Sequence, residues 1–278
     1  MDFNKELNKA TDGLMDLFFP RSCPFCGRRV GKKLLCDVCK ETLPYCRTVR
    51  QGAGFGRCAA PFYYEDAVRK AILDYKFKGK LGGLDCFGSM MAATAAEVYS
   101  GGFDAVTWVP VSKKRLRKRG FDQARYLTAS LCVDWHTAPL ETLRKITDNP
   151  PQSGIDDAAA RRANVLGVYE AVSPEQFAGK RLLLVDDICT TGATLGECAR
   201  VLKEAGAAEV MCLTLAMTRE EYTGKVWGIV EISAGHFFGN KTVNNCKLLL
   251  QNGSAVSIIR NWEKIGNLPY SIIQMRNG

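Results

Sequence analysis

The sequence lacks any long apolar segment. No stretch approaches the roughly 20 continuous apolar residues that a membrane-spanning helix needs, so we expect no membrane span. The N-terminus also lacks the basic start and apolar run of a signal peptide, because Asp2, Glu6 and Asp12 lie there. We therefore expect a cytoplasmic protein.

The composition is that of a folded, soluble protein. The 278 residues allow one large domain or two smaller ones, and a hydrophobic content of 46% is sufficient for a packed core. The formal net charge of +9 favours anionic partners, either phosphorylated small molecules or nucleic acid. Charge alone does not choose between these two classes.

Four of the twelve cysteines form two Cys-x-x-Cys pairs, Cys23 with Cys26 and Cys36 with Cys39. In a reducing compartment such clusters bind metal more often than they form disulfides. Two such pairs can complete a tetrahedral thiolate site for Zn²⁺, and four sulfurs leave no open coordination position, so the predicted zinc is structural. The alternative is a pair of redox-active dithiols, although neither pair lies in the βαβ context of a thioredoxin-type site.

The region around these cysteines is basic. The first 60 residues hold 11 Lys and Arg against 6 Asp and Glu, so a zinc-binding module can contact nucleic acid phosphates, and a solvated basic surface is an equally good interpretation. Residues 1–19 have the spacing of an amphipathic helix. The three glycines between Gln51 and Gly56 predict a linker. Cys46 and Cys58 lack Cys-x-x-Cys partners and are interpreted as ordinary thiols.

The most informative stretch begins with the apolar run from Leu182 to Val185, which predicts a buried parallel strand that ends at two carboxylates, Asp186 and Asp187. A small polar loop follows and opens a predicted helix over 195–205. Backbone N–H groups at such a helix start bind anions, so the loop predicts a sugar-phosphate site with the carboxylates beside it for ribose hydroxyls. The loop residues are Thr190, Thr191, Gly192, Ala193 and Thr194. No lysine follows the glycine, which argues against a Walker A ATPase, and a strand, capped turn and helix without a ligand is the remaining alternative.

A second charged segment follows the predicted strand over 103–111. Six of the seven residues from Lys113 to Arg119 are basic. A loop of this charge after a strand is suited to hold pyrophosphate or a nucleic acid backbone. A solvated charged loop is the alternative. The candidate contacts are Val111, Lys113, Lys114, Arg115 and Arg119.

Taken together, these motifs resemble a known family. Leu182 to Thr194 resembles the phosphoribosyl pyrophosphate (PRPP) signature of type I phosphoribosyltransferases. Val109-Pro-Val111, the Arg-Gly-Phe-Asp-Gln that ends at Gln123, Pro150 to Gly154 and Arg161-Arg-Ala-Asn164 then occur in the order seen in ComF-type competence proteins. The resemblance covers about residues 20–217. It departs from the family pattern in the missing second Cys-x-x-Cys cluster, in Asp122 where Asn is usual, and in a tail of about sixty residues.

The resemblance implies an α/β fold: a zinc-binding module, then a type I phosphoribosyltransferase domain with a mainly parallel sheet and flanking helices. PRPP would bind with Mg²⁺, its 5′-phosphate on Thr190 to Thr194 and its ribose on the expected catalytic residues Asp186 and Asp187. Its pyrophosphate would face the basic loop. Single-stranded DNA and DNA-uptake proteins are the further partners that it implies.

We expect three regions: residues 1–58 with the N-terminal helix and zinc module, 59–217 with the phosphoribosyltransferase domain, and 218–278 as an extension. In the second region we expect helices over 66–77 and 84–99 and a last strand over 209–216. In the extension, the Asn-Gly pair within 247–259 predicts a hairpin.

The acceptor of the phosphoribosyl group cannot be read from the sequence. Some purine-salvage relatives place an acid where this chain has Thr190, and threonine cannot act as a carboxylate base. Two hypotheses follow: an enzyme that transfers phosphoribosyl groups, and a catalytically silent single-stranded-DNA-binding scaffold of the DNA-uptake machinery.

Overall fold

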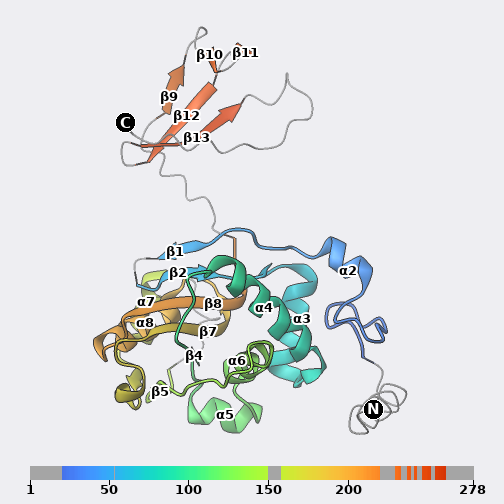
Figure 1. Ribbon diagram of the computed structural model, residues 1–278, viewed down its shortest axis with the longest axis vertical. Coiled ribbons are helices and arrows are strands. Elements are labelled where there is room, and N and C mark those ends of the chain that lie inside the picture. The colour runs from blue at the N-terminus through green and yellow to red at the C-terminus, as the bar shows by residue number, and fades with distance from the viewer. Residues whose placement is uncertain are drawn as a thin grey trace, which may run out of the picture. The chain divides into compact units, whose positions relative to one another are not determined.

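The computed structural model describes residues 21–52, 54–149 and 158–219, together with five strands between residues 229 and 260 (Figure 1). The chain divides into two compact units, Met1–Arg219 and Glu220–Gly278. The predicted helix over 1–19 and the motif Pro150 to Gly154 lie outside the described residues.

A six-stranded sheet forms the centre of the first unit. Its strand order is β1-β2-β8-β7-β4, and β3 also pairs with β8. The pairs β2–β8, β3–β8, β7–β8 and β4–β7 are parallel, and β1 pairs antiparallel with β2. The strands are β1 (Arg50–Gly52), β2 (Gly56–Ala59), β3 (Phe62–Tyr63), β4 (Ala105–Trp108), β7 (Arg181–Cys189) and β8 (Glu209–Met217). The predicted mainly parallel sheet is therefore confirmed.

Helices cover both faces of this sheet (Figure 1). Alternate residues of β7 point to opposite faces, so Leu183 packs in the core cluster that includes residues of α3, α4 and α6, and Leu184 packs in the cluster that includes residues of α8. The helices are α3 (Asp66–Lys78), α4 (Leu84–Val98), α6 (Gln123–Asp134), α7 (Ala158–Val165) and α8 (Ala193–Glu204). The predicted helices over 66–77, 84–99 and 195–205 are thus confirmed within two residues.

Shorter elements complete this unit. They are α2 (Asp37–Thr42), α5 (Lys113–Arg119), β5 (Leu143–Lys145), β6 (Tyr169–Ala171) and two 3₁₀ turns, η1 (Leu81–Gly83) and η3 (Pro174–Gln176). β5 and β6 pair with each other antiparallel, outside the central sheet.

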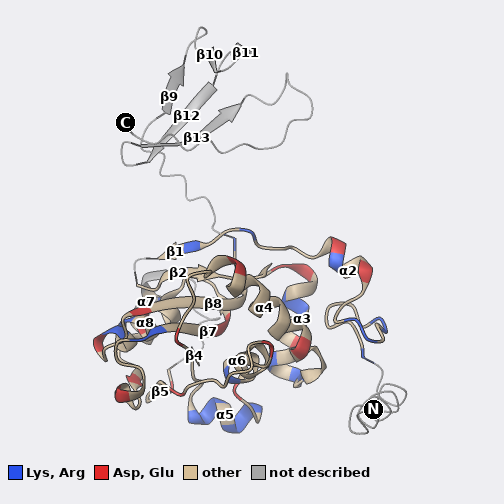
Figure 2. Cartoon of the chain, viewed as in Figure 1, with Lys and Arg blue, Asp and Glu red and all other residues tan. Residues whose placement is uncertain are grey.

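The basic segment Lys113 to Arg119 is a helix, α5, and the prediction of a loop was wrong. Ser112 begins it by accepting a hydrogen bond from the backbone N–H of Arg115 at 3.2 Å, and Gly120 ends it in the left-handed conformation at φ 83°. Lysine and arginine between two such caps are good helix formers. Figure 2 shows α5 as a blue, basic helix at one end of the first unit.

The predicted linker over 51–56 is also corrected. Gln51 and Gly52 pair with Arg57 and Gly56 in the β1–β2 hairpin, and β2 continues into the central sheet through Cys58 and Ala59. Because β2 carries residues on both sides of the expected boundary at residue 58, the zinc module runs directly into the sheet.

The β7 strand is longer than the apolar run predicted. It continues through both carboxylates to Cys189, because Asp186, Ile188 and Cys189 keep their register with Thr214, Ala216 and Met217 of β8. The carboxylates therefore lie on a rigid strand, not on a loop after it.

In the second unit, β12 (Cys246–Gln251) and β13 (Ser254–Arg260) pair antiparallel, which confirms the predicted hairpin. β12 also pairs with β9 (Ile229–Ile232), and β10 (Phe237–Phe238) pairs with β11 (Lys241–Thr242).

Candidate functional site

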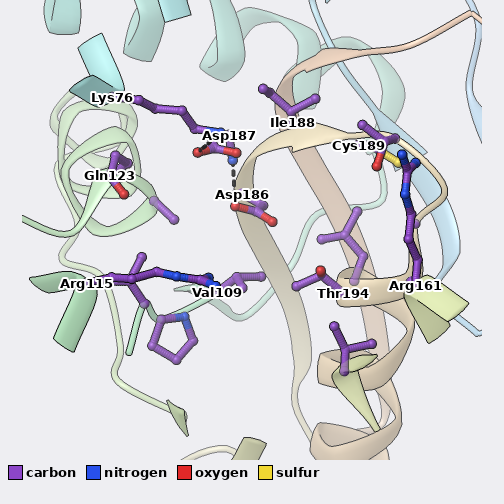
Figure 3. Close-up of a pocket in the computed structure, with 18 of the residues that line it drawn as sticks. Lys76, Val109, Arg115, Gln123, Arg161, Asp186, Asp187, Ile188, Cys189 and Thr194 are labelled. Atoms are coloured by element: carbon purple, nitrogen blue, oxygen red, sulfur yellow. Dashed lines mark hydrogen bonds and ion pairs between the residues drawn. The ribbon is translucent and has the colours of Figure 1, made fainter. Parts of the chain in front are cut away.

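A cavity of about 460 Å³ lies at the carboxyl ends of β4 and β7, where ligands of parallel sheets usually bind (Figure 3). Six cationic side chains and two carboxylates line it. The cations are Arg69, Lys76, Arg115, Arg119, Lys145 and Arg161, and the carboxylates are Asp186 and Asp187. This excess of positive charge suits a polyanionic ligand.

The two carboxylates have different surroundings. Asp187 Oδ2 lies 2.7 Å from Lys76 Nζ of α3, the ion pair drawn in Figure 3. Asp186 Oδ1 accepts a hydrogen bond of 2.8 Å from the backbone N–H of Asp187. Burial and the neighbouring Asp187 carboxylate raise the pKa of Asp186 well above its usual range. A cation placed between these oxygens would favour the ionised form of both groups.

The predicted phosphate loop lines the same cavity along its whole length, Thr190 to Thr194. Gly192 immediately precedes α8 at φ 75°, and no side chain of the described residues caps this helix end. The Ala193 N–H makes a long hydrogen bond of 3.4 Å to Thr191 Oγ1. An uncapped helix start with hydroxyl groups beside it is well suited to bind a phosphate.

The residues predicted from the basic segment divide into two groups. Val111, Arg115 and Arg119 line the cavity, and Lys113 and Lys114 are not among its described lining residues. Arg115 Nη2 donates to the Asn149 carbonyl at 2.7 Å. Arg119 Nη1 donates to Gln123 Oε1 at 2.8 Å, and its guanidinium lies 5.2 Å from the centre of the Phe77 ring.

Four cavity cations were missing from the predicted site. Lys76 lies in the last turn of α3, where several lysines precede and follow Gly79, and that feature could have indicated an anion contact. Arg161 belongs to the Arg-Arg-Ala-Asn motif and, in the view of Figure 3, lies on the opposite side of β7 from Arg115. Arg69 and Lys145 carry no local sequence signal, because only the tertiary fold brings them to the cavity.

Lys145 is the most buried of the six cations, with 8% of its surface exposed. Its Nζ lies 3.4 Å from the hydroxyl of buried Tyr169 and 5.1 Å from the centre of that ring. In the described part of the chain no carboxylate forms an ion pair with it, in contrast to Lys76. Burial, and to a lesser degree Arg115, lower the pKa of Lys145 to about 8.

Asp122, the unusual residue in the Arg-Gly-Phe-Asp-Gln segment, is structural. Its carboxylate accepts hydrogen bonds of 3.1 Å from the backbone N–H groups of Val111 and Arg125. It thereby caps α6 and fixes the chain where it leaves β4. Asp122 is buried, so its carboxylate is not part of the exposed basic surface of α5.

The zinc module brings its four cysteines together. All four sulfur atoms lie within 4.8 Å of one another, with Cys26 Sγ 3.5 Å from Cys36 Sγ. Four thiolates around Zn²⁺ at about 2.3 Å lie roughly 3.8 Å apart in a tetrahedron, so this donor set fits a structural zinc. Phe25 from the same segment packs edge-on against Phe62 and Phe87, with ring centres 5.4 and 5.8 Å away.

Comparisons with known proteins agree with this arrangement. The phosphoribosyl transferase domain family matches residues 118–239, and the double zinc ribbon domain family matches residues 14–70. Competence protein ComFC of Bacillus subtilis (strain 168) is 30% identical over 194 residues, which cover 69% of this chain and 76% of that protein. The chain belongs to the ComF family.

Two further relatives of this ComF-family protein differ in coverage. Competence protein ComFC of Streptococcus pneumoniae (strain ATCC BAA-255 / R6) is 26% identical over 73% of this chain and 84% of its own length. DNA utilization protein YhgH of Escherichia coli (strain K12) is 30% identical, over 41% of this chain and 50% of its own length. The fold is thus a zinc-binding module joined to a phosphoribosyltransferase domain, as the sequence predicts. Among the helices that the structure describes, none is long and apolar enough to cross a membrane.

Proposed function

We propose that this ComF-family protein binds PRPP with Mg²⁺ in the cavity and transfers the phosphoribosyl group to an acceptor in the cytoplasm. The observation that carries this proposal is the meeting of Asp186, Asp187 and the uncapped start of α8 in one cavity with six cations. PRPP presents a ribose with a phosphate at one end and a pyrophosphate at the other, so it needs both kinds of group.

Each part of the cavity has a role in this proposal. Thr190 to Thr194 hold the 5′-phosphate, Asp186 and Asp187 hold the ribose hydroxyls, and the cations around Val111 hold the pyrophosphate. Mg²⁺, when bound, offsets part of the pyrophosphate charge, and carboxylate oxygens are ligands that it prefers. We add Lys145 to the pyrophosphate contacts, because its buried ammonium has only a phenolic oxygen as its hydrogen-bond partner among the described residues.

In the transfer step, the bond between the anomeric carbon and the pyrophosphate oxygen breaks, and pyrophosphate leaves with the electron pair. The acceptor forms the new bond with a lone pair, and its proton passes to the departing pyrophosphate or to solvent. Fixed cations such as Arg115, Arg119 and Lys145 stabilise the charge that develops on the leaving group. Thr190 cannot serve as a carboxylate base, which weakens a purine-salvage assignment.

Calorimetric titration of PRPP with Mg²⁺ into the zinc-loaded protein tests this proposal. We expect saturable binding that Asp186→Asn combined with Asp187→Asn weakens at least roughly tenfold, since charge-assisted contacts are lost. Asp104→Asn is the matched control, because Asp104 pairs with Arg181 at the opposite end of β7. Equal PRPP affinity in the double variant and the wild type would refute the proposed ligand.

A second proposed function is single-stranded DNA binding by a catalytically silent protein of the DNA-uptake machinery. It is favoured by the exposed basic residues of α5 that do not line the cavity, namely Lys113, Lys114, Arg117 and Lys118. The names of the relatives, competence protein and DNA utilization protein, agree with this role.

Fluorescence anisotropy with a labelled single strand distinguishes the two functions. Replacing those four cations by glutamine should weaken DNA binding and flatten its salt dependence, since each phosphate contact releases a counterion. PRPP binding should persist in the same variant. DNA affinity that survives the loss of these charges would refute this role for α5.

A further inference from the structure

The β1–β2 hairpin, expected to be a linker, packs directly against the phosphate loop. Arg50 of β1 is 9% exposed. Its guanidinium donates to the carbonyl oxygens of Thr190 and Thr218, with a longer contact of 3.4 Å to the carbonyl of Cys189. The Thr218 N–H donates to the same Cys189 carbonyl at 3.0 Å. One side chain therefore joins the start of the loop to the end of β8.

Two close packing contacts extend this support along the loop. A Cβ at Gly192 would overlap the ring of Phe55, and the φ of 75° at Gly192 also disfavours any other residue. A Cβ at Gly54 would lie 3.0 Å from the Cα of Gly196 in the first turn of α8. Three residues of the hairpin region, Arg50, Gly54 and Phe55, thus contact the segment that begins the helix.

These contacts act on the backbone of the loop. Hydrogen bonds from a charged donor are stronger than neutral ones, and the planar guanidinium can hold several carbonyls in fixed positions. Once the carbonyls of Cys189 and Thr190 are held by Arg50, the peptide orientation of the loop is set before a ligand arrives. A site that is ordered in advance loses less free energy on binding.

We infer that Arg50 is a positioning residue, which orders the phosphate loop through its backbone, and that the β1–β2 hairpin supports this loop from outside the cavity. The consequence for ligand binding rests on the proposed function. The ordering of the loop by Arg50 does not depend on that function. Arg50 is not among the cavity-lining residues, so it acts through the loop and not by contact with the ligand.

Hydrogen exchange of the ligand-free protein tests the ordering directly. Amides of the peptide spanning residues 187–198 should exchange roughly ten- to hundredfold faster in Arg50→Ala, because charge-assisted bonds to the loop are lost. Arg57→Ala is the matched control, since Arg57 lies on the same hairpin and contacts the Val98 carbonyl and the Tyr99 ring. Zinc content and circular dichroism report whether each variant is folded. If Arg50→Ala does not fold, the exchange of the same peptide is measured in Arg50→Lys. This variant keeps the charge but loses the planar fork, so the peptide should again exchange faster than in the wild type.

Binding of two simple probes tests the effect on the ligand. Arg50→Ala should weaken the binding of ribose 5-phosphate roughly ten- to hundredfold and weaken the binding of inorganic pyrophosphate much less. Added guanidinium ion should restore part of the lost affinity by filling the vacated space. Unchanged exchange of the 187–198 peptide in a folded Arg50 variant would overturn the inference. If the wild type binds neither probe, the proposed function fails while the exchange experiment still decides the role of Arg50.

Discussion

Replacing Lys145 by methionine should stabilise the protein and weaken its binding of pyrophosphate. Methionine keeps the length of the buried side chain and removes the ammonium. The pKa of Lys145 falls from 10.5 to about 8 in the folded protein, chiefly because of burial. A shift of this size corresponds to at most about 3 kcal/mol in the free energy of unfolding. Burial of the charged ammonium lowers the stability of the folded protein by this amount.

The pH dependence of this effect has a definite sign. Between pH 8 and 10.5 the unfolded chain holds a proton on Lys145 that the folded protein releases. Stability therefore rises with pH across this window. Below pH 8 the buried ammonium destabilises the folded protein by the full amount, and above pH 10.5 this destabilisation is absent.

Urea unfolding of the wild type and of Lys145→Met at pH 7 and pH 10 measures this difference. We expect the variant to be more stable at pH 7 by up to about 3 kcal/mol and the advantage to shrink towards pH 10. Lys113→Met, at an exposed position of α5, is the control and should show neither effect. A Lys145→Met protein that is less stable than the wild type at both pH values would refute the reasoning.

The same variant should bind inorganic pyrophosphate roughly tenfold more weakly, because a bound oxyanion would supply the charged partner that no described residue gives this buried ammonium. A gain of stability together with a loss of binding is the pattern of a group retained for function. Wild-type binding near pH 8 should also take up protons, which titration in buffers of different ionisation enthalpy detects. Binding without proton uptake, or unchanged affinity in Lys145→Met, would remove this lysine from the pyrophosphate site.

Two further predictions concern the scaffold. Removing zinc with a chelator should unfold the module and expose Phe25, whose ring packs on Phe62 and Phe87. The melting temperature should therefore fall, and added zinc should restore it. An unchanged melting curve after complete zinc removal would contradict this. Asp122→Ala should cost about 1–3 kcal/mol in urea unfolding, because the backbone N–H groups of Val111 and Arg125 both lose their acceptor. Asp122→Asn should cost less, because its one amide oxygen can still accept from one of these two groups; equal losses in the two variants would contradict the capping role.

The parts of the site that were predictable from the sequence are those built from consecutive residues. The run from Leu182 to Thr194 carries its strand, its carboxylates and its loop in one segment, so local pattern predicted the strand and the helix that follows, although the strand continues to Cys189. The cysteine pairs are equally local. The caps of α5, Ser112 and Gly120, were also present in the sequence, but the density of positive charge between them was interpreted as a loop.

The remaining features depend on packing between distant segments. Glycines over 51–56 indicate flexibility when considered alone, yet Gly54 lacks a side chain because the Cα of Gly196 lies against it. Lys145 occupies an inward position of a short strand where an apolar residue is expected, and only the tertiary fold brings it into the lining of one cavity with Asp186 and Tyr169. Neither the Gly54–Gly196 contact nor the place of Lys145 at the cavity can be predicted from neighbouring residues in the sequence.

These contacts between distant segments place residues of the candidate site outside the matched phosphoribosyl transferase region. The phosphoribosyl transferase family matches residues 118–239, but Lys76, Val109 and Val111 line the cavity from outside that range. Arg50 and Phe55, still closer to the zinc module, support the phosphate loop. Because the hairpin that carries them also pairs with β8, loss of order in the N-terminal region would reach the phosphate loop through β1 and β2. One continuous segment, β1 and β2, therefore joins the zinc module to the central sheet and to the predicted phosphate loop.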